Sequence, residues 1–308
     1  MNATLPVSQQ PAAAAGWCAT ASLQFQQRYG RTQFQGGASA PLKLMRSTAQ
    51  SSGHCELPLL HTAGGLVGGD QLQLQVELAA GSRALLTSVA AQKVYGSVRR
   101  SRRHPQGSWA AQRLHVRQAA GSDLEWLPQE LVLYADALYE QTLQVELAAG
   151  ASFLGVEVVR LGRSAAGENL GEGCWRSRTE IRRLATASQG ERWELVDRLQ
   201  LSGEALHAEH GMAGQPVFGS LVWAAPEPIE APALQQLLEQ AREARTGLEG
   251  SMACGPLNQG LVARYRGPSS QAARFWFCRM WALIRAQRGQ AAPELPRVWP
   301  FQEQPLQP

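Results

Sequence analysis

LQVELAAG, residues 74–81, occurs again without change at residues 143–150, and a degenerate copy, LHVRQAAG, lies at residues 114–121. Apolar and polar side chains alternate ahead of each Ala-Ala-Gly, and a period of two is typical of a strand with one buried face. A short apolar run follows each copy, at residues 82–87, 122–127 and 151–156. The sequence therefore predicts three units of strand, turn and strand, in which glycine takes the positive φ of the turn.

The copies are unevenly spaced, which argues against a strict solenoid. We instead predict stacked antiparallel hairpins in a β-helix-like arrangement. Further strands are expected at residues 175–184 and 192–201, where apolar positions continue. The β-rich part is expected to extend over residues 17–223.

The pattern changes after residue 223, where AAPEPIEAP forms a proline-rich link. A helix is predicted from Pro232, because proline suits the first helical turn and apolar residues follow at positions 234, 237, 238 and 241. A second helix is predicted over residues 270–288 and a hairpin over residues 257–265. The fold class is therefore mainly β, with two α-helices near the C-terminus. We expect a disordered tail over residues 1–16 and one domain over residues 17–308, with both helices and the hairpin within 230–290.

Composition narrows the class of protein. The chain has 308 residues, of which 44% are hydrophobic and 18% charged, and its formal net charge is +4. That charge is small for a protein that coats nucleic acid. Five cysteines without a CxxC pair favour neither a zinc ribbon nor a redox motif. Neither a signal peptide nor a membrane span is predicted, so we expect a cytoplasmic protein with reduced thiols.

The glycine-rich phrase Gly64-Gly65-Leu-Val-Gly68-Gly69-Asp70 is the most unusual in the chain. It is neither the phosphate loop GxxxxGK[ST] nor the dinucleotide loop GxGxxG. A tight structural turn is the favoured interpretation, and a functional surface is the alternative. Asp70 then either caps the turn or points its carboxylate at a cation.

Two sets of histidines are candidate metal ligands. Thiolate and imidazole suit nickel, zinc and copper, so His54, Cys55 and His61 could gather around such a metal. Their spacing is weak evidence, and a buried cysteine with hydrogen-bonded histidines is favoured. For His207 and His210, which lack the HExxH pattern, a polar loop is favoured.

The run VRRSRRHP places four arginines between Arg99 and Arg103, followed by His104. Such a run can bind phosphate, so an RNA-binding protein that uses Arg99–Arg103 is the alternative function. No RNP-type aromatic phrase accompanies it, and a solvated hairpin tip or a protein-docking patch is favoured.

No catalytic set of residues is evident. The GxSxG elbow is absent. Glu125 and Glu130 lie five residues apart, an odd separation that puts them on opposite faces of a strand rather than in an acid–base pair. Residue chemistry alone therefore favours a binding or scaffold protein over an enzyme.

Long phrases of the chain resemble one family in order. They are Cys55 with LLHTAGGLVGGDQLQLQVELAAGSRALLTSVAAQKVYGS (59–97), LEWLPQELVLYADA (124–137), RTE (178–180), LVDRLQL (195–201), GQPVFGSL (214–221), PLNQGLVARY (256–265), FWFCRMWALIR (275–285) and PELPRVW (293–299). The family is that of the urease accessory proteins UreD, also called UreH. The resemblance runs from about residue 17 to residue 299. This sequence differs from the family pattern at Thr62-Ala63, where the family has two prolines, and at Gly96, where the family has arginine.

The resemblance implies a urease maturation factor rather than an enzyme. Such a factor is a scaffold or chaperone that binds urease apoprotein and UreF, which recruits the GTPase UreG. It implies a largely β fold with two C-terminal helices, no tightly bound cofactor, and GTP that belongs to UreG. Nickel would be in transit through an internal polar tunnel toward urease, and neither nucleic acid nor membrane would be a partner.

A tunnel for a hydrated cation needs inward polar groups that bind weakly enough to release it. The candidates for this role are Asp70, Glu130, Glu180 and Asp197, with Cys55 and His61 nearby, and Lys93 is a possible ion-pair partner for one of them. Phe275 and Trp281 lie outside the apolar stripe of the second helix. They are candidates for partner binding, and a second buried side of the helix is the alternative.

Overall fold

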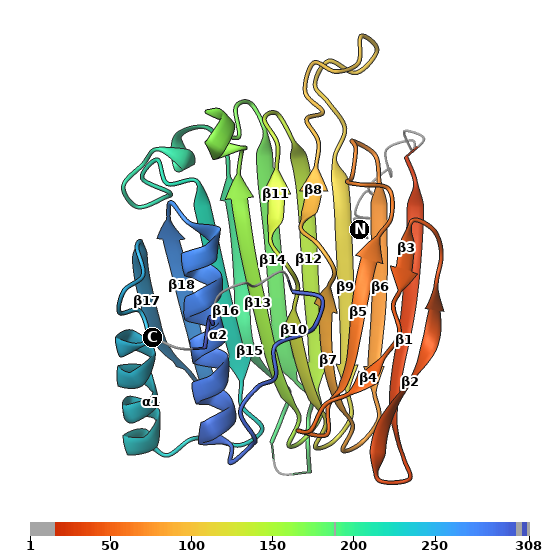
Figure 1. The fold of residues 1–308 in the computed structure, drawn as a ribbon, viewed down its shortest axis with the longest axis vertical. Helices are drawn as coiled ribbons and strands as arrows, with labels where there is room; N and C mark the ends of the chain where they lie inside the picture. Colours follow the sequence, from red (N-terminus) through yellow and green to blue (C-terminus); the bar gives the residue numbers. More distant parts are fainter. Residues whose placement is uncertain (1–15, 188, 300–303, 307–308) are drawn as a thin grey trace, which may run out of the picture.

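The computed structural model describes residues 16–187, 189–299 and 304–306. Within them, two open β-sheets lie face to face, and two helices cover part of the second sheet (Figure 1). The tail expected over 1–16 lies outside the described residues except for Gly16. No helix of the described ranges is both long and apolar enough to cross a membrane.

The first sheet, sheet A, contains seven strands within the described residues, in the order β15-β14-β12-β9-β6-β1-β2. Their bounds are β1 (Cys18–Arg28), β2 (Arg31–Ala38), β6 (Gln71–Leu78), β9 (Ala110–Gln118), β12 (Leu138–Leu147), β14 (Cys174–Arg183) and β15 (Arg192–Leu201).

Sheet B contains eleven strands in the same part of the chain, eight of them in the order β17-β18-β16-β13-β10-β7-β5-β3. The bounds are β3 (Leu42–Leu44), β4 (Thr48–Ala49), β5 (Cys55–His61), β7 (Arg83–Ser88), β8 (Gln92–Val94), β10 (Asp123–Leu127), β11 (Leu131–Leu133), β13 (Ser152–Leu161), β16 (Val217–Ala224), β17 (Ser251–Leu257) and β18 (Gly260–Gly267).

The stacked repeat, the β-helix-like arrangement and the mainly β class are confirmed. The expectation that each repeat is a hydrogen-bonded hairpin is wrong. Each Ala-Ala-Gly turn carries the chain from sheet A to sheet B, so the two strands of a unit lie in different sheets. Equivalent strands of successive units pair in parallel instead, with Leu74 and Leu143 both opposite Leu114. This pairing satisfies the backbone groups between units and lets the apolar faces of both sheets meet across one core.

The repeat turns stack like the strands. Gly81, Gly121 and Gly150 all have φ between 64° and 67°. The Gly81 N–H donates to the Ala120 carbonyl, and the Gly121 N–H donates to the Ala149 carbonyl. The left-handed turn conformation, which glycine adopts without a steric penalty, is thus repeated from unit to unit.

Two further short elements and two helices complete the described chain. They are the 3-10 turns η1 (Ser164–Ala166) and η2 (Gly203–Leu206), and the helices α1 (Ala231–Glu243) and α2 (Ser270–Gln287). The predictions of helices from about 232 and over 270–288, and of strands at 175–184 and 192–201, are confirmed within a few residues. The predicted hairpin is β17 and β18, and it begins earlier than expected. Ser269 caps α2 by accepting the Ala272 N–H with its side chain.

The fold contains two hydrophobic cores. One core lies between the two sheets and includes Leu23, Val116 and Phe153. The other lies between sheet B and the helices and includes Trp223, Leu238 and Trp276. Strand β13 contributes alternate residues to both cores and is therefore buried on both faces. Strand β6 has one buried face and one exposed face, as its alternation predicts.

Candidate functional site

A cavity of about 130 Å³ lies between the two sheets. Leucines and other apolar side chains form part of its wall. Its polar lining comes from both sheets and the segments that join them. These residues are His61, Ser88, Gln92, Gln112, Gln129, Gln141, Thr142, Glu157, Ser177, Arg178, Thr179, Asp197 and Ser220. The space is large enough for several water molecules.

Glu157 is one of the two carboxyl groups that line this cavity. It stands on β13 on the same face as Phe153 and Val159, which belong to the core between the sheets. Within the described residues no hydrogen bond or ion pair reaches its carboxyl. Burial raises the pKa of Glu157 to about 8, against the opposing charge of Arg264, and Asp197 raises the pKa further. At neutral pH the group is therefore largely protonated, and an arriving cation would favour its ionised form.

Asp197 lies on the opposite wall, on β15 of sheet A. Its Oδ2 forms an ion pair with Nη2 of Arg264, which stands on β18 of sheet B. The Arg264 guanidinium also donates to the Ser220 hydroxyl. One arginine thus spans the two sheets beside the cavity and partly offsets the negative charge there.

His61 ends β5 and lines the same cavity. Both of its ring nitrogens are buried and without a hydrogen-bond partner in the described structure. Burial lowers the pKa of His61, and the charge of Asp70 acts in the opposite direction. A neutral imidazole with an available lone pair is a ligand for borderline metals such as nickel.

Of the six residues proposed from the sequence as tunnel groups, His61 and Asp197 line the cavity. The other four lie elsewhere. Glu130 pairs with Arg274 of α2 at 3.0 Å. Glu180 accepts from Arg178, Arg198 and Gln144. Cys55 is buried on β5, and that burial raises the pKa of its thiol.

Asp70 lies outside the cavity lining and holds the glycine-rich turn. Its Oδ1 accepts the backbone N–H of Trp17 at 3.0 Å, and its Oδ2 accepts that of Val67 at 2.9 Å. Asp70 therefore caps the turn, which was one of the two roles considered for it from the sequence; the other was to point its carboxylate at a cation. No ion pair of Lys93 occurs among the described residues.

The glycines of the turn pack where a side chain would collide. A Cβ on Gly65 would lie 2.6 Å from the ring of Tyr95, and a Cβ on Gly68 would lie 2.3 Å from the Ser97 hydroxyl. Gly64 and Gly69 have φ values of 76° and 104°. The turn therefore fixes the end of β5 and the start of β6 against the base of the neighbouring loop.

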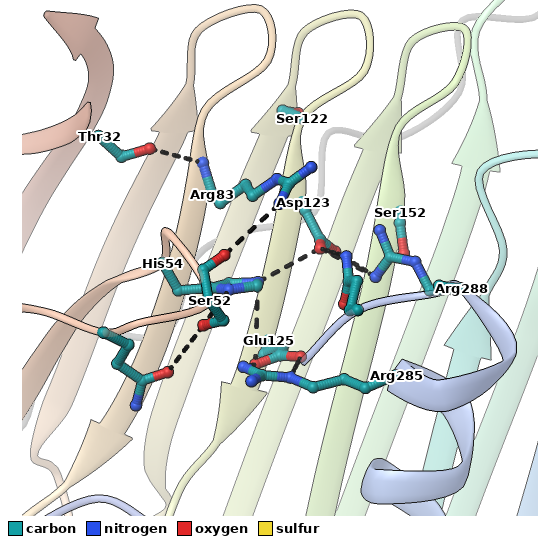
Figure 2. A network of polar contacts seen from close by, with 12 residues as sticks. Thr32, Ser52, His54, Arg83, Ser122, Asp123, Glu125, Ser152, Arg285 and Arg288 are labelled. Carbon is teal, nitrogen blue, oxygen red and sulfur yellow. Dashed lines mark hydrogen bonds and ion pairs between the residues drawn. The ribbon is translucent and has the colours of Figure 1, made fainter. Parts of the chain in front are cut away.

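A second set of buried charges, which the sequence analysis did not predict, lies on the other side of sheet B (Figure 2). Glu125 of β10 makes a bidentate pair with Arg285 of α2, with N–O distances of 2.8 and 2.5 Å. The Trp281 indole N–H donates to the same carboxylate at 2.7 Å. Arg285 is completely buried, so this pair joins α2 to the sheet below the protein surface, and its Nη1 has no hydrogen-bond partner in the described structure.

Asp123 extends the network toward the end of α2. Its carboxylate contacts Arg288 at 2.8 Å, Nε2 of His54 at 3.3 Å and the amide of Gln290 at 3.1 Å. Although burial acts to raise the pKa of Asp123, the hydrogen bond from His54 and the charge of Arg288 hold it well below its usual range. His54 is thereby a partner of this carboxylate and is not grouped with His61. We name Asp123, Glu125, His54, Arg285 and Arg288 the ionic network.

A sequence signal for the network existed. Glu125 interrupts an apolar strand run, and Arg285 and Arg288 share one face of a helix that is otherwise buried. The same packing decides the placement of the two aromatic residues proposed for partner binding. Trp281 is completely buried and Phe275 is 9% exposed. Both therefore lie on a second buried side of α2, which was the alternative to partner binding in the sequence analysis.

No group of three or more histidine, cysteine, aspartate or glutamate side chains in the described ranges is close enough together to hold a metal ion. The cavity instead offers one imidazole and two carboxyl groups on separate strands, β5, β13 and β15. Chemically, it suits a mobile cation with its water better than a tightly held one.

Comparison with known proteins gives one consistent result. A family profile described as "UreD urease accessory protein" matches residues 18–300. A protein named "Urease accessory protein UreD" from Synechococcus sp. (strain CC9902) is 61% identical over 290 residues, covering 94% of this chain and 93% of the relative. Its namesake from Prochlorococcus marinus (strain MIT 9303) is 58% identical over 273 residues, covering 89% and 91%. The chain therefore belongs to the UreD family of urease accessory proteins.

Proposed function

We propose that this protein is a cytoplasmic, non-enzymatic scaffold of urease maturation, and that nickel passes through the cavity between its sheets on the way to urease. Membership of the UreD family supports the role in urease maturation. The observation that carries the passage is the polar lining of an otherwise apolar interior by His61, Glu157 and Asp197. Nickel is here a cargo and not a resident cofactor.

The chemistry of these groups suits transit. Protonated Glu157 carries no charge while the cavity holds no cation. When a cation arrives, the carboxyl loses its proton and becomes a negatively charged ligand. Arg264 offsets the charge of Asp197 and so weakens the attraction of that carboxylate for the cation. Both effects limit the residence time of the metal, which a conduit requires.

The proposal includes the partners that the family resemblance implies. Urease apoprotein and UreF would bind this chain, and UreG would join through UreF. Nucleotide chemistry would belong to UreG, because this sequence has no phosphate loop of the GxxxxGK[ST] type.

Reconstitution tests the passage. The variants are Glu157→Gln and Asp197→Asn, combined in one chain and mixed with urease apoprotein, UreF, UreG, GTP and nickel. We expect complexes of normal size by gel filtration and nickel in urease reduced on the order of tenfold, measured by mass spectrometry of the metal.

The matched control is Glu180→Gln, which removes a carboxylate outside the cavity that hydrogen-bonds to Arg178, Arg198 and Gln144. It should leave the nickel content unchanged. Normal nickel loading by the cavity variant, with equal complex formation, would exclude the cavity as the route.

A further inference from the structure

Two exposed apolar side chains are held together at the glycine-rich end of the molecule. Trp17 is 62% exposed and Val67 is 52% exposed. The two carboxylate oxygens of Asp70 accept their backbone N–H groups, and the Trp17 carbonyl accepts the N–H of Gln71. These side chains therefore stand on a fixed backbone rather than on a loose end, which reduces the entropy lost when a partner covers them.

A basic loop stands beside this apolar pair. Residues 99–106 project beyond the ends of both sheets, between β8 and β9 (Figure 1). The loop is internally hydrogen-bonded, because the Arg99 N–H donates to Pro105 O and the Gly107 N–H donates to His104 O. Within the described part of the chain, Arg99 pairs with Glu172, whereas Arg102 and Arg103 form no ion pair.

The base of the loop packs against the glycine-rich turn that carries Val67, so the loop and the apolar pair lie at the same end of the molecule. The hydroxyl of Ser97 and the carbonyl of Ser108, at the base of the loop, pack directly on Gly68, next to Val67 in the chain. The Ser97 hydroxyl donates to Ser108 O, and the Ser108 N–H donates back to that hydroxyl. We name Trp17, Val67 and the loop of residues 99–106 the glycine-end surface.

We propose that the glycine-end surface docks an acidic segment of a partner protein that carries an apolar side chain among its carboxylates. The apolar side chain would be buried on Trp17 and Val67, and the carboxylates would meet Arg102 and Arg103. A protein segment fits better than RNA, because the net charge of the chain is only +4 and Trp17 is the one Trp, Tyr or Phe ring of this surface that could stack on a base. The proposal stands apart from the cavity and does not require that nickel passes through it.

Binding of a synthetic probe to the full chain tests the surface. The probe is a short fluorescein-labelled peptide of Asp and Glu around a central Leu-Phe pair, followed by fluorescence anisotropy. The comparison peptide has Asn and Gln in place of the acidic residues. We expect Arg102→Glu with Arg103→Glu, and separately Trp17→Ala, each to weaken binding on the order of tenfold at low salt.

The chain offers a matched control at the turn between β1 and β2. Arg28→Glu with Arg31→Glu reverses two arginine charges there, and Tyr29→Ala removes a side chain that is 99% exposed. These variants should bind the acidic peptide as the unmodified chain does. Equal weakening by the control variants, or equal binding of the neutral peptide, would overturn the proposal.

Two other occupants are outcomes of the same experiment. Tighter binding of a labelled single-stranded RNA than of the peptide, lost in the Arg102/Arg103 variant, would replace the proposal with a nucleic-acid site. Self-association in sedimentation that the same variant abolishes would assign the surface to a second copy of the chain. A cavity variant should leave peptide binding unchanged, so this test and the nickel test fail separately.

Discussion

The ionic network under α2 and the lining of the cavity both enclose titratable side chains, but the side chains of the network are paired and two of those at the cavity are not. In the network, Glu125 and Asp123 are paired with Arg285 and Arg288. At the cavity, the Glu157 carboxyl forms no hydrogen bond or ion pair among the described residues, and both ring nitrogens of His61 lack a hydrogen-bond partner there. Sheet B separates the two regions, so the difference arises from packing within one structure and not from distant domains.

The difference separates side chains that hold the fold together from side chains that are free to bind a ligand. A paired group in a buried contact has used most of its hydrogen-bonding capacity to fix one element against another, although Nη1 of Arg285 has no hydrogen-bond partner in the described structure. An unpaired carboxyl or imidazole at a cavity costs stability and keeps its capacity for something that arrives later. Burial of titratable groups alone therefore does not distinguish the two sides of sheet B.

The largest expected loss of stability comes from removing one member of the ionic network. Arg285→Ala leaves the Glu125 carboxylate buried beside Trp281 without its counter-ion, which should lower the free energy of unfolding by about 3–5 kcal/mol. Urea denaturation measures it. Arg198→Ala, which removes an ion pair with a 67% exposed arginine, is the control and should cost at most about 1 kcal/mol.

Equal losses in the two variants would mean that the network does not hold α2. A second variant separates loss of the pair from general damage. Glu125→Leu combined with Arg285→Met removes both charges, and it should recover most of the stability lost by Arg285→Ala.

The next largest effect concerns the unpaired Glu157 carboxyl at the cavity and the pH dependence of folding stability. The pKa of Glu157 is about 8 in the folded chain and about 4.3 when unfolded. Between these values the folded state holds a proton that the unfolded state has lost, so folding stability falls as pH rises through this window. Glu157→Gln removes that dependence.

We therefore expect the stability of Glu157→Gln, relative to the unmodified chain, to increase by about 1–3 kcal/mol between about pH 5 and pH 8. Urea titrations at both pH values measure the change. A constant difference between the two proteins would show that Glu157 is ionised and solvated in the cavity rather than held in its protonated form.

The smallest effect concerns Asp70, a buried carboxylate satisfied by backbone rather than by a counter-ion. Asp70→Ala leaves the N–H groups of Trp17 and Val67 without acceptors and should cost about 1–2 kcal/mol, measured as a lower melting temperature. Asp70→Asn keeps one acceptor and should lose less. If the Asp70→Ala protein has normal stability but delivers less nickel, Asp70 belongs with the groups that bind the cation and not with those that hold the fold.

Much of the fold could be predicted from residues 71–156, because the period of two and the repeated Ala-Ala-Gly mark strands and turns locally. The pairing could not be predicted. Alternation shows which face of a strand is buried, but the same alternation serves a hairpin and a unit whose strands lie in opposite sheets. Only the stacking of Leu74, Leu114 and Leu143 in one row distinguishes the two.

The site was predictable in part. His61 and Asp197 were chosen for their chemistry, and both line the cavity. Glu157 was missed because it stands in an apolar run whose neighbours face two different cores. The pair of Glu125 and Arg285 was missed because 160 residues separate its members, a distance at which sequence spacing carries no geometric information.

The identical octapeptides at 74–81 and 143–150 have a consequence for how the chain reaches this structure. They form β6 and β12, which flank β9 at the same height, so each is a chemically equivalent competitor for the other's place beside β9. The discrimination must come from what differs around them. The divergent middle copy provides some of it, since Arg117 and His115 meet Glu146 on β12. An internal duplication that stayed perfect in all three copies would have left the order of assembly ambiguous, and the altered residues of the middle copy help to specify it.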